Sequence, residues 1–276
     1  MKTERPWLVA QASVAGSSHE NSSTVCQDAH SSEIVQSVEG PVLVVAVSDG
    51  AGSACCAEIG SRIAVNAICE QATEYFIGGG RLSAVTRSLM SDWFAGVREQ
   101  IADAAAHGAM RDYACTLLVT MVGNEDAAFA QLGDGAMVAL TRENGWAWIF
   151  WPQHGEYANT TYFVTEDGAL DQFEFECRQR QILEVATFTD GLEQLVLDFR
   201  LRTPHEPFFH RMFAPLRSTT SGDCSSLSKH LESYLVSPGV RERTDDDVTL
   251  VLARRASPTE AASELVHVGD DDAKPY

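Results

Sequence analysis

Three stretches of the chain are almost wholly apolar and each adjoins an aspartate. Between Pro41 and Val47 the residues are apolar and mostly β-branched, which is typical of a strand buried on both faces, and Ser48-Asp49-Gly50 follows directly. Residues 182–189 repeat this design before Asp190-Gly191, and Asp246-Asp247 precedes the apolar run 248–252. The pattern predicts rigid strands that each carry a carboxylate at one end.

The other apolar stretches show either strand or helix periodicity. Alternation bounded by turn residues predicts strands at 7–15, 28–38, 115–122, 127–132, 136–141, 146–151 and 173–177. We expect the second of these strands to pair with the first as a hairpin, after a turn at 16–24. Apolar residues at helical spacing predict helices at 54–76, 82–106, 192–199 and 224–235.

The order of these elements predicts an α+β fold. Strands joined by tight turns favour antiparallel sheets, and helices kept apart from them favour a layered domain over a doubly wound one. We expect one domain over residues 1–255, which is within the usual size range. After Arg255 the residues become small and acidic and include Asp270-Asp271-Asp272, so 256–276 is predicted to be a disordered acidic tail.

The charge, the apolar stretches and the cysteines of the chain argue against several classes of protein. The 276 residues carry a formal net charge of −19, which argues against a nucleic-acid or anionic-membrane partner because binding to phosphates needs a basic surface. No stretch approaches the roughly 20 apolar residues of a membrane span, and the first residues do not resemble a secretory signal. We therefore expect a cytoplasmic protein. The seven cysteines include no Cys-x-x-Cys pair, which argues against a zinc site or a disulfide framework.

Four short acidic signatures suggest one divalent-metal site: residues 26–29 (Cys-Gln-Asp-Ala), 48–50 (Ser-Asp-Gly), 189–191 (Thr-Asp-Gly) and 245–249 (Asp-Asp-Asp-Val-Thr). An Asp-Gly pair alone is more often an ordinary turn. Carboxylates brought together without a cation repel and raise one another's pKa. A hard, oxygen-binding ion such as Mg2+ or Mn2+ would offset that repulsion.

Taken in order, the motifs resemble those of the metal-dependent protein phosphatases, the PPM or type 2C family, and specifically its compact bacterial members. The similarity spans about residues 13–253, and its motifs lie at 16–19, 26–30, 47–53, 115–118, 133–135, 189–191 and 246–249. The resemblance implies a four-layer α-β-β-α sandwich, in which two packed antiparallel sheets are flanked by helices. That architecture agrees with the order of strands and helices.

The resemblance also implies roles for individual residues. Asp49 corresponds to the ligand that bridges two metal ions, and the backbone carbonyl of Gly50 would contribute to the second ion. Asp190 and Asp246 correspond to the remaining direct ligands. Asp28 corresponds to the acid that holds a water beside the ions. Asp28 and Asp49 are therefore the predicted catalytic residues, with two Mn2+ or Mg2+ ions as cofactors.

Two further acids are placed by the same comparison. Asp134, together with Asp190, corresponds to the region of a looser third metal in many family members. Asp247 occupies a position where relatives often carry Asn, so we assign it to the shell around the metal ligands.

The chain departs from the family pattern at two positions. Ser23 stands where many relatives have a phosphate-binding arginine, and Ala51 replaces a histidine proposed as general acid in eukaryotic relatives. His19 and Arg62 are candidates for phosphate binding, although Arg62 lies four residues after Glu58 and an ordinary helix-surface pair is the favoured interpretation of Arg62.

The predicted function is hydrolysis of phosphoserine and phosphothreonine on proteins, with a water activated between two metal ions and no protein nucleophile. The partners would be a phosphorylated protein and a Ser/Thr kinase or its targets. Two alternatives stay open: a pseudophosphatase that binds phosphoproteins, and a two-metal phosphodiesterase or nuclease, which should show histidine ligands or a basic groove. Residues 155–162 are predicted to form a loop at the rim of the site that influences substrate choice.

Overall fold

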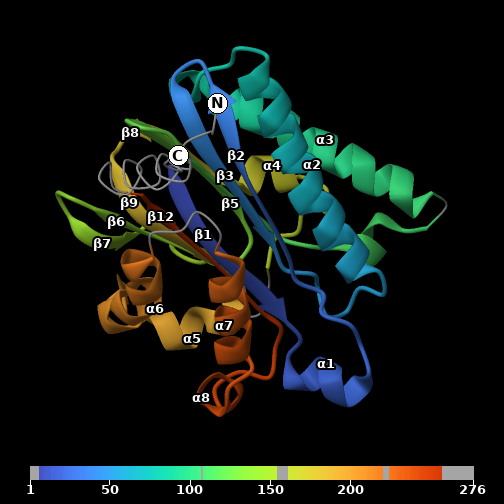
Figure 1. The fold of residues 1–276 in the computed structure, drawn as a ribbon. Coiled ribbons are helices and arrows are strands. Elements are labelled where there is room, and N and C mark those ends of the chain that lie inside the picture. The colour runs from blue at the N-terminus through green and yellow to red at the C-terminus, as the bar shows by residue number, and fades with distance from the viewer. Residues whose placement is uncertain (1–5, 107, 154–160, 220–223, 257–276) are drawn as a thin grey trace, which may run out of the picture.

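Two five-stranded antiparallel sheets form the centre of the molecule (Figure 1). The computed structural model describes residues 6–106, 108–153, 161–219 and 224–256. The first sheet contains, in spatial order, β1 (Trp7–Val14), β12 (Val248–Arg255), β9 (Ile182–Phe188), β6 (Ala136–Thr141) and β7 (Gly145–Trp148). The second sheet contains β2 (Ala29–Ser37), β3 (Gly40–Ser48), β4 (Leu117–Val122), β5 (Asp126–Leu132) and β8 (Glu174–Gln179). A small hairpin joins β10 (Leu197–Asp198) to β11 (Thr203–Pro204).

Helices cover the outer face of each sheet. The second sheet packs against α2 (Ala57–Ile77), α3 (Arg87–Ala105) and the short α4 (Ala169–Gln172). The first sheet packs against α6 (Glu206–Ser218) and α7 (Ser225–Leu235). Shorter helical segments are α1 (Ser17–Ser22), α5 (Glu193–Val196), α8 (Pro238–Arg241) and three 3-10 turns at Leu82–Ala84, Met110–Tyr113 and Asp190–Leu192. The predicted four-layer α-β-β-α sandwich is therefore confirmed.

Strand β3 shows why the sequence produces this layering. Successive side chains of a strand point to opposite faces of the sheet. Leu43, Val45 and Val47 pack between the two sheets, whereas Val42 and Val44 pack toward the helices of the second sheet. All five are at most 1% exposed, which confirms the predicted burial on both faces. The strand therefore ends in a rigid setting directly before Asp49.

The predicted hairpin between the first two strands is wrong. β1 pairs with β12 in the first sheet, and β2 pairs with β3 in the second. The predicted turn between β1 and β2 contains helix α1, and the chain changes sheets there. A Cβ on Gly16 would lie 2.2 Å from the backbone carbon of Asp246, so only glycine allows this close approach to the segment before β12.

Other differences concern the helices. The helix predicted at 82–106 is divided into a 3-10 turn and α3, where Thr86 caps the first turn by accepting a hydrogen bond from the Leu89 amide. The helix predicted at 192–199 stops at Val196. Helix α6 was not predicted, because Pro215 lies inside it and obscures a helical pattern of buried phenylalanines. The predicted strand at 146–151 ends at Trp148.

Two sequence predictions concern residues that the structure covers only in part. The acidic tail lies outside the described residues apart from Ala256, whose amide donates to the Pro6 carbonyl at 2.8 Å. Within the predicted rim loop, residues 155–160 lie outside the described ranges as well. Among the helices that are described, none is both long and apolar enough to cross a membrane.

Candidate metal centre

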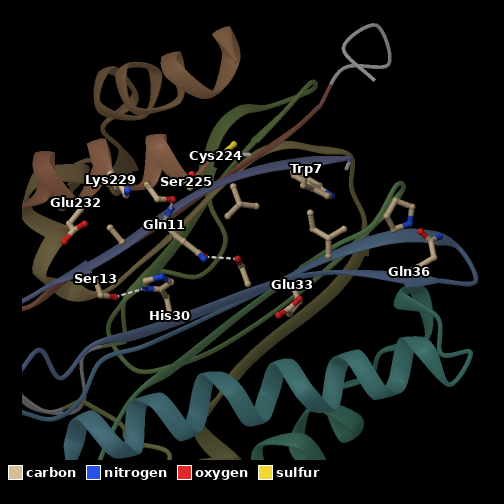
Figure 2. Close-up of a pocket in the computed structure, with 16 residues that line it drawn as sticks. Trp7, Gln11, Ser13, His30, Glu33, Gln36, Cys224, Ser225, Lys229 and Glu232 are labelled. Carbon is tan, nitrogen blue, oxygen red and sulfur yellow. Dashed lines mark hydrogen bonds between the residues drawn. The ribbon is translucent and has the colours of Figure 1, made fainter. Parts of the chain in front are cut away.

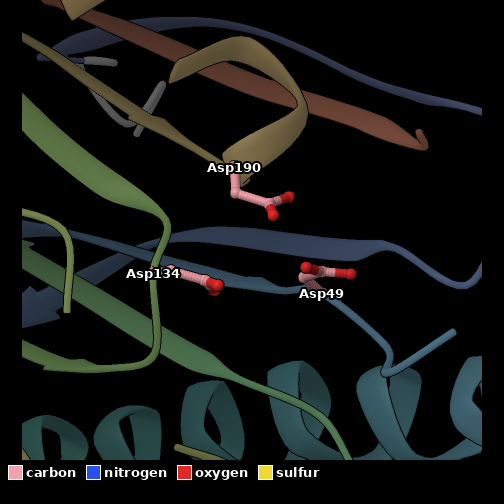
Figure 3. Close-up of side chains that lie close together, drawn as sticks. All are labelled: Asp49, Asp134 and Asp190. Atoms are coloured by element: carbon pink, nitrogen blue, oxygen red, sulfur yellow. The ribbon is translucent and has the colours of Figure 1, made fainter. Parts of the chain in front are cut away.

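Three aspartates converge at one end of the sandwich (Figure 3). Asp49 follows β3, Asp134 lies between β5 and β6, and Asp190 follows β9, so both sheets contribute. One carboxylate oxygen from each residue lies within 4.8 Å of the other two. Asp134 is buried, whereas Asp49 and Asp190 are half-buried. The group is therefore anchored in the fold and still open to solvent.

Asp28 and Asp246 flank this group. Asp28 immediately precedes β2 and is buried, and its Oδ2 accepts a hydrogen bond from the Thr189 hydroxyl at 2.8 Å. Asp246 lies on the loop before β12 and is exposed. The negative charges of both residues raise the pKa of Asp49. Of the five aspartates that the sequence assigned to the metal site, the structure groups three and places the other two near enough for their charges to act on Asp49.

The carboxylates disfavour one another's charge. Removal from water, followed by the charges of its four neighbours, raises the pKa of Asp49 well above its usual range. Burial is also the main cause that raises the pKa of Asp28 to about 8 and that of Asp190 to about 7, and it raises the pKa of Asp246. Bringing charged groups out of water and close together is unfavourable without an opposite charge.

This arrangement fits divalent cations. The donors are all carboxylate oxygens, which are the ligands that Mg2+ and Mn2+ prefer. Two buried oxygens, Asp28 Oδ1 and Asp190 Oδ1, accept no hydrogen bond from any described residue. A cation or a water beside it would satisfy these atoms, and its charge would offset the repulsion.

Backbone contacts hold the loop that carries Asp49. Its amide donates to Thr116 Oγ1 at 2.9 Å, and its carbonyl accepts from the Thr116 amide at 2.8 Å. A Cβ on the next residue, Gly50, would lie 2.7 Å from the Gln27 carbonyl oxygen and 2.8 Å from Cβ of Ala57. Glycine at position 50 therefore lets the segment before Asp28 and the start of α2 pack against the loop.

Asp247 connects the segments around the centre and is not a member of the three-aspartate group. Its carboxylate accepts hydrogen bonds from the amide of Gly16 at 2.8 Å and from the amide of Gln27 at 2.5 Å. Nδ1 of His19 also lies 2.8 Å from the same carboxylate. Asp247 is 2% exposed, so these contacts join α1 and the residue before Asp28 firmly to the start of β12.

The two candidates for phosphate binding have different surroundings. The contact with Asp247 occupies Nδ1 of His19 and leaves Nε2 as the nitrogen that a phosphate would have to reach. Arg62 is exposed on α2 and, in the part of the chain that the structure describes, makes no ion pair with Glu58 or with the site aspartates. Ser23, at the position of the family arginine, is an exposed residue with a left-handed backbone (φ 57°).

Two residues of the site were missed by the sequence reasoning. Glu193 begins α5 one turn after Asp190 and is 7% exposed; burial, followed by the charges of Asp190 and Asp134, raises its pKa to about 9. Its Oε1 has no hydrogen-bond partner among the described residues. The signal in the sequence was a further acid three positions after Asp190. Thr161, at the described end of the predicted rim loop, donates its hydroxyl proton to Asp134.

Known proteins resemble this chain in sequence. A family model described as protein phosphatase 2C matches residues 15–236. Serine/threonine-protein phosphatase 3 from Escherichia coli (strain K12) is 35% identical over 250 residues, which cover 90% of this chain and 98% of that protein.

Solved structures share the fold at low sequence identity. The serine/threonine phosphatase Stp1 from Staphylococcus aureus has a TM-score of 0.61 at 13% identity, with 93% of this chain and 98% of that chain covered. The Mycobacterium tuberculosis serine/threonine phosphatase PstP/Ppp has a TM-score of 0.59 at 14% identity, with 91% and 99% covered. The family match covers most of the chain and the relative is similar over almost its full length, and the chain therefore belongs to the protein phosphatase 2C family.

Proposed function

We propose that this chain is a metal-dependent serine/threonine protein phosphatase that hydrolyses phosphate monoesters on proteins. The observation that carries the proposal is the convergence of Asp49, Asp134 and Asp190 within 4.8 Å at an end of the sandwich that is open to solvent. The family match and the similar Escherichia coli phosphatase support the same reaction class. The proposed cofactors are two Mn2+ or Mg2+ ions, with a third near Asp134.

The protein's own groups would hold the reactants. Divalent ions bound to these residues would lower the pKa of a nearby water toward neutrality and offset the charge of the phosphate. Asp49, the Gly50 carbonyl, Asp190 and Asp246 are the proposed ligands. Asp28 Oδ1, which accepts no hydrogen bond from the described residues, is the oxygen available to accept one from the attacking water. The water would form a bond to phosphorus and lose a proton toward Asp28 as the bond between phosphorus and the Ser or Thr oxygen breaks, and the released oxygen would take up a proton from solvent.

The test is phosphate release from a phosphothreonine peptide with Mn2+, with Mg2+ and with EDTA. We expect the native protein to release phosphate only when a metal is present. Asp49→Asn and Asp246→Asn should each lower the turnover by more than roughly 100-fold, which is the upper end of the loss when a residue that only supports the metal ligands is changed. Asp103→Asn, which makes the same change on an exposed face of α3, serves as the control and should keep full activity. Unchanged turnover in Asp49→Asn would contradict the proposed site.

A phosphoprotein-binding pseudophosphatase is the second candidate, and the exposed serine at position 23 favours it. Such a protein would bind Mn2+ and a phosphothreonine peptide without releasing phosphate. Calorimetry with Mn2+ and with the peptide, on folded protein, separates the two candidates. A bis-ester substrate in place of the peptide tests the phosphodiesterase alternative, for which we expect no turnover.

A further inference from the structure

An irregular segment at residues 161–167 lies against the metal centre. These residues belong to no helix or strand, so side chains and turns must hold them in place. The Thr161 hydroxyl donates a hydrogen bond to Asp134, one of the three grouped aspartates (Figure 3). Phe163 packs against a small apolar cluster that includes Ala51, on the loop after β3. The segment therefore contacts two of the loops that form the centre.

Val164 anchors the middle of this segment. Its side chain is fully buried, and its amide donates to the Cys115 carbonyl at 2.8 Å. Cys115 directly precedes Thr116, whose hydroxyl and amide hold the backbone of Asp49. One side of the Val164 peptide group is thus tied to the residues that support the centre.

Arg98 holds the other side of Val164. It lies on α3, in the outer helical layer (Figure 1). Its Nη1 donates to the Val164 carbonyl and, at 2.6 Å, to the Glu166 carbonyl. A charged donor makes a stronger hydrogen bond than a neutral one, and a buried carbonyl without a donor is unfavourable. Loss of the guanidinium would therefore loosen the segment at two backbone positions.

We infer, on the basis of the proposed phosphatase function, that Arg98 is a positioning residue that holds residues 161–167 against the metal centre, so that Thr161 orients the Asp134 carboxylate. Hydrogen bonds to a metal ligand fix its direction, and their loss typically weakens metal binding. Arg98 acts through the backbone of Val164 and Glu166, and Thr161 supplies the contact with the carboxylate.

Arg87, on the same helix, provides a matched comparison. Its Nη2 donates to the Phe173 carbonyl at 2.6 Å, and its guanidinium carbon lies 4.1 Å from the centre of the Phe173 ring. These contacts tie α3 to the residue before β8 and involve no residue of the 161–167 segment. Arg87→Met and Arg98→Met each remove one guanidinium and keep an apolar stem, but only Arg98→Met should affect Asp134.

A second control comes from the cavity of about 880 Å³ between the edge strands β1 and β2 (Figure 2). There the Ser32 hydroxyl donates to Gln11 Oε1 at 2.7 Å, and Ser13 Oγ lies 2.7 Å from His30 Nδ1. Both contacts join the two sheets, and neither involves the 161–167 segment. Ser32→Ala therefore reports what the loss of a tie between elements does to the centre in general.

Calorimetry with Mn2+ on the folded variants tests the inference. The weakest binding step belongs to the proposed third ion near Asp134, and we expect its affinity to fall roughly 10-fold in Arg98→Met, as for other groups that support metal ligands. Thr161→Val, which removes the hydroxyl and keeps the shape, should cause a similar loss. Arg87→Met and Ser32→Ala should bind Mn2+ like the native protein.

The double variant separates positioning from a general loosening of the fold. If Arg98 acts through Thr161, adding Arg98→Met to Thr161→Val should cause no further loss of Mn2+ affinity, because coupled residues are not additive. Losses that add, a loss in Arg87→Met equal to that in Arg98→Met, or native affinity in Arg98→Met would each overturn the inference.

Nuclear magnetic resonance provides a readout that needs neither metal nor activity. In EDTA, the carbon-13 shift of the Asp134 carboxylate should change in Arg98→Met and in Thr161→Val, and it should stay unchanged in Arg87→Met. An unchanged shift in Arg98→Met would overturn the positioning role. If the native protein releases no phosphate, the proposed function fails, and these spectra still decide whether Arg98 positions Thr161 on Asp134.

Discussion

The carboxylate end of the sandwich and the apolar layer beneath it are built from the same strands but contribute opposite energies. Between the sheets, Leu43, Val45 and Phe129 are at most 1% exposed and pack in one cluster, which favours folding. At the end of β3, Asp49 faces four other carboxylates whose charges raise its pKa. The apolar layer stabilises the fold, and the acidic end introduces repulsion that a bound cation would offset.

The largest expected effect on stability comes from the apolar layer. Phe129 lies on β5 and is fully buried between the sheets. Phe129→Ala should lower the free energy of unfolding by about 3–5 kcal/mol, because it removes apolar burial and leaves a cavity. Chemical denaturation measures the change, and Phe199→Ala, at a side chain that is 42% exposed, is the control. A loss below about 1 kcal/mol would show that this layer is not closely packed.

A smaller effect is expected where the two regions meet. In Gly50→Ala the new Cβ would lie 2.7 Å from the Gln27 carbonyl oxygen, and the backbone must shift to accommodate it. We expect a loss of about 1–3 kcal/mol in the free energy of unfolding, as for other overpacked sites, together with weaker Mn2+ binding. Gly52→Ala is the matched control, since a Cβ there would have nothing within 4 Å and φ is not positive at this residue. Similar losses in both variants would contradict the close packing around residue 50.

The smallest effect is a pH dependence at the acidic end. Burial raises the pKa of Asp28 from its ordinary value of 3.8 to about 8 in the folded protein. Protonation of Asp28 therefore stabilises the folded state. This contribution to the free energy of unfolding is complete below about pH 4 and is lost as the pH rises toward 8. In EDTA, Asp28→Asn should gain stability relative to the native protein between pH 5 and pH 8.

Denaturation midpoints at the two pH values measure this gain. Asp103→Asn, at an exposed residue, should show no such trend. Saturating Mn2+ should reduce the gain, because cations favour the ionised carboxylate. A difference between Asp28→Asn and the native protein that does not change with pH would contradict the raised pKa.

The local features of the site could be predicted from the sequence because they are encoded by adjacent residues. An apolar run that ends in Asp-Gly indicates both a buried strand and a carboxylate at its end, as for Asp49 and Asp190. The resemblance to the phosphatase family added the order in which such motifs occur. Glu193 escaped notice because its position in a short helix after the motif gives no periodic signal, although its burial is evident in the structure.

The pairing of strands could not be predicted in the same way. Alternation predicts that residues 7–14 form a strand but does not specify the partner, and the nearest strand in sequence was the wrong choice. The true partner, β12, lies more than 230 residues away in the chain, at 248–255. Close approach at Gly16 and the contacts of Asp247 with Gly16 and Gln27 accompany this long-range pairing.

The sequence by itself determined which segments form strands and helices and which aspartates stand at strand ends, because hydrophobic periodicity and turn chemistry act over a few residues. Only the tertiary structure decided that Asp134 joins Asp49 and Asp190, that Asp28 and Asp246 lie near them, and that Ser13 contacts both His30 and Thr249. These contacts join residues from different strands and both sheets, and they exist only once the two sheets have packed.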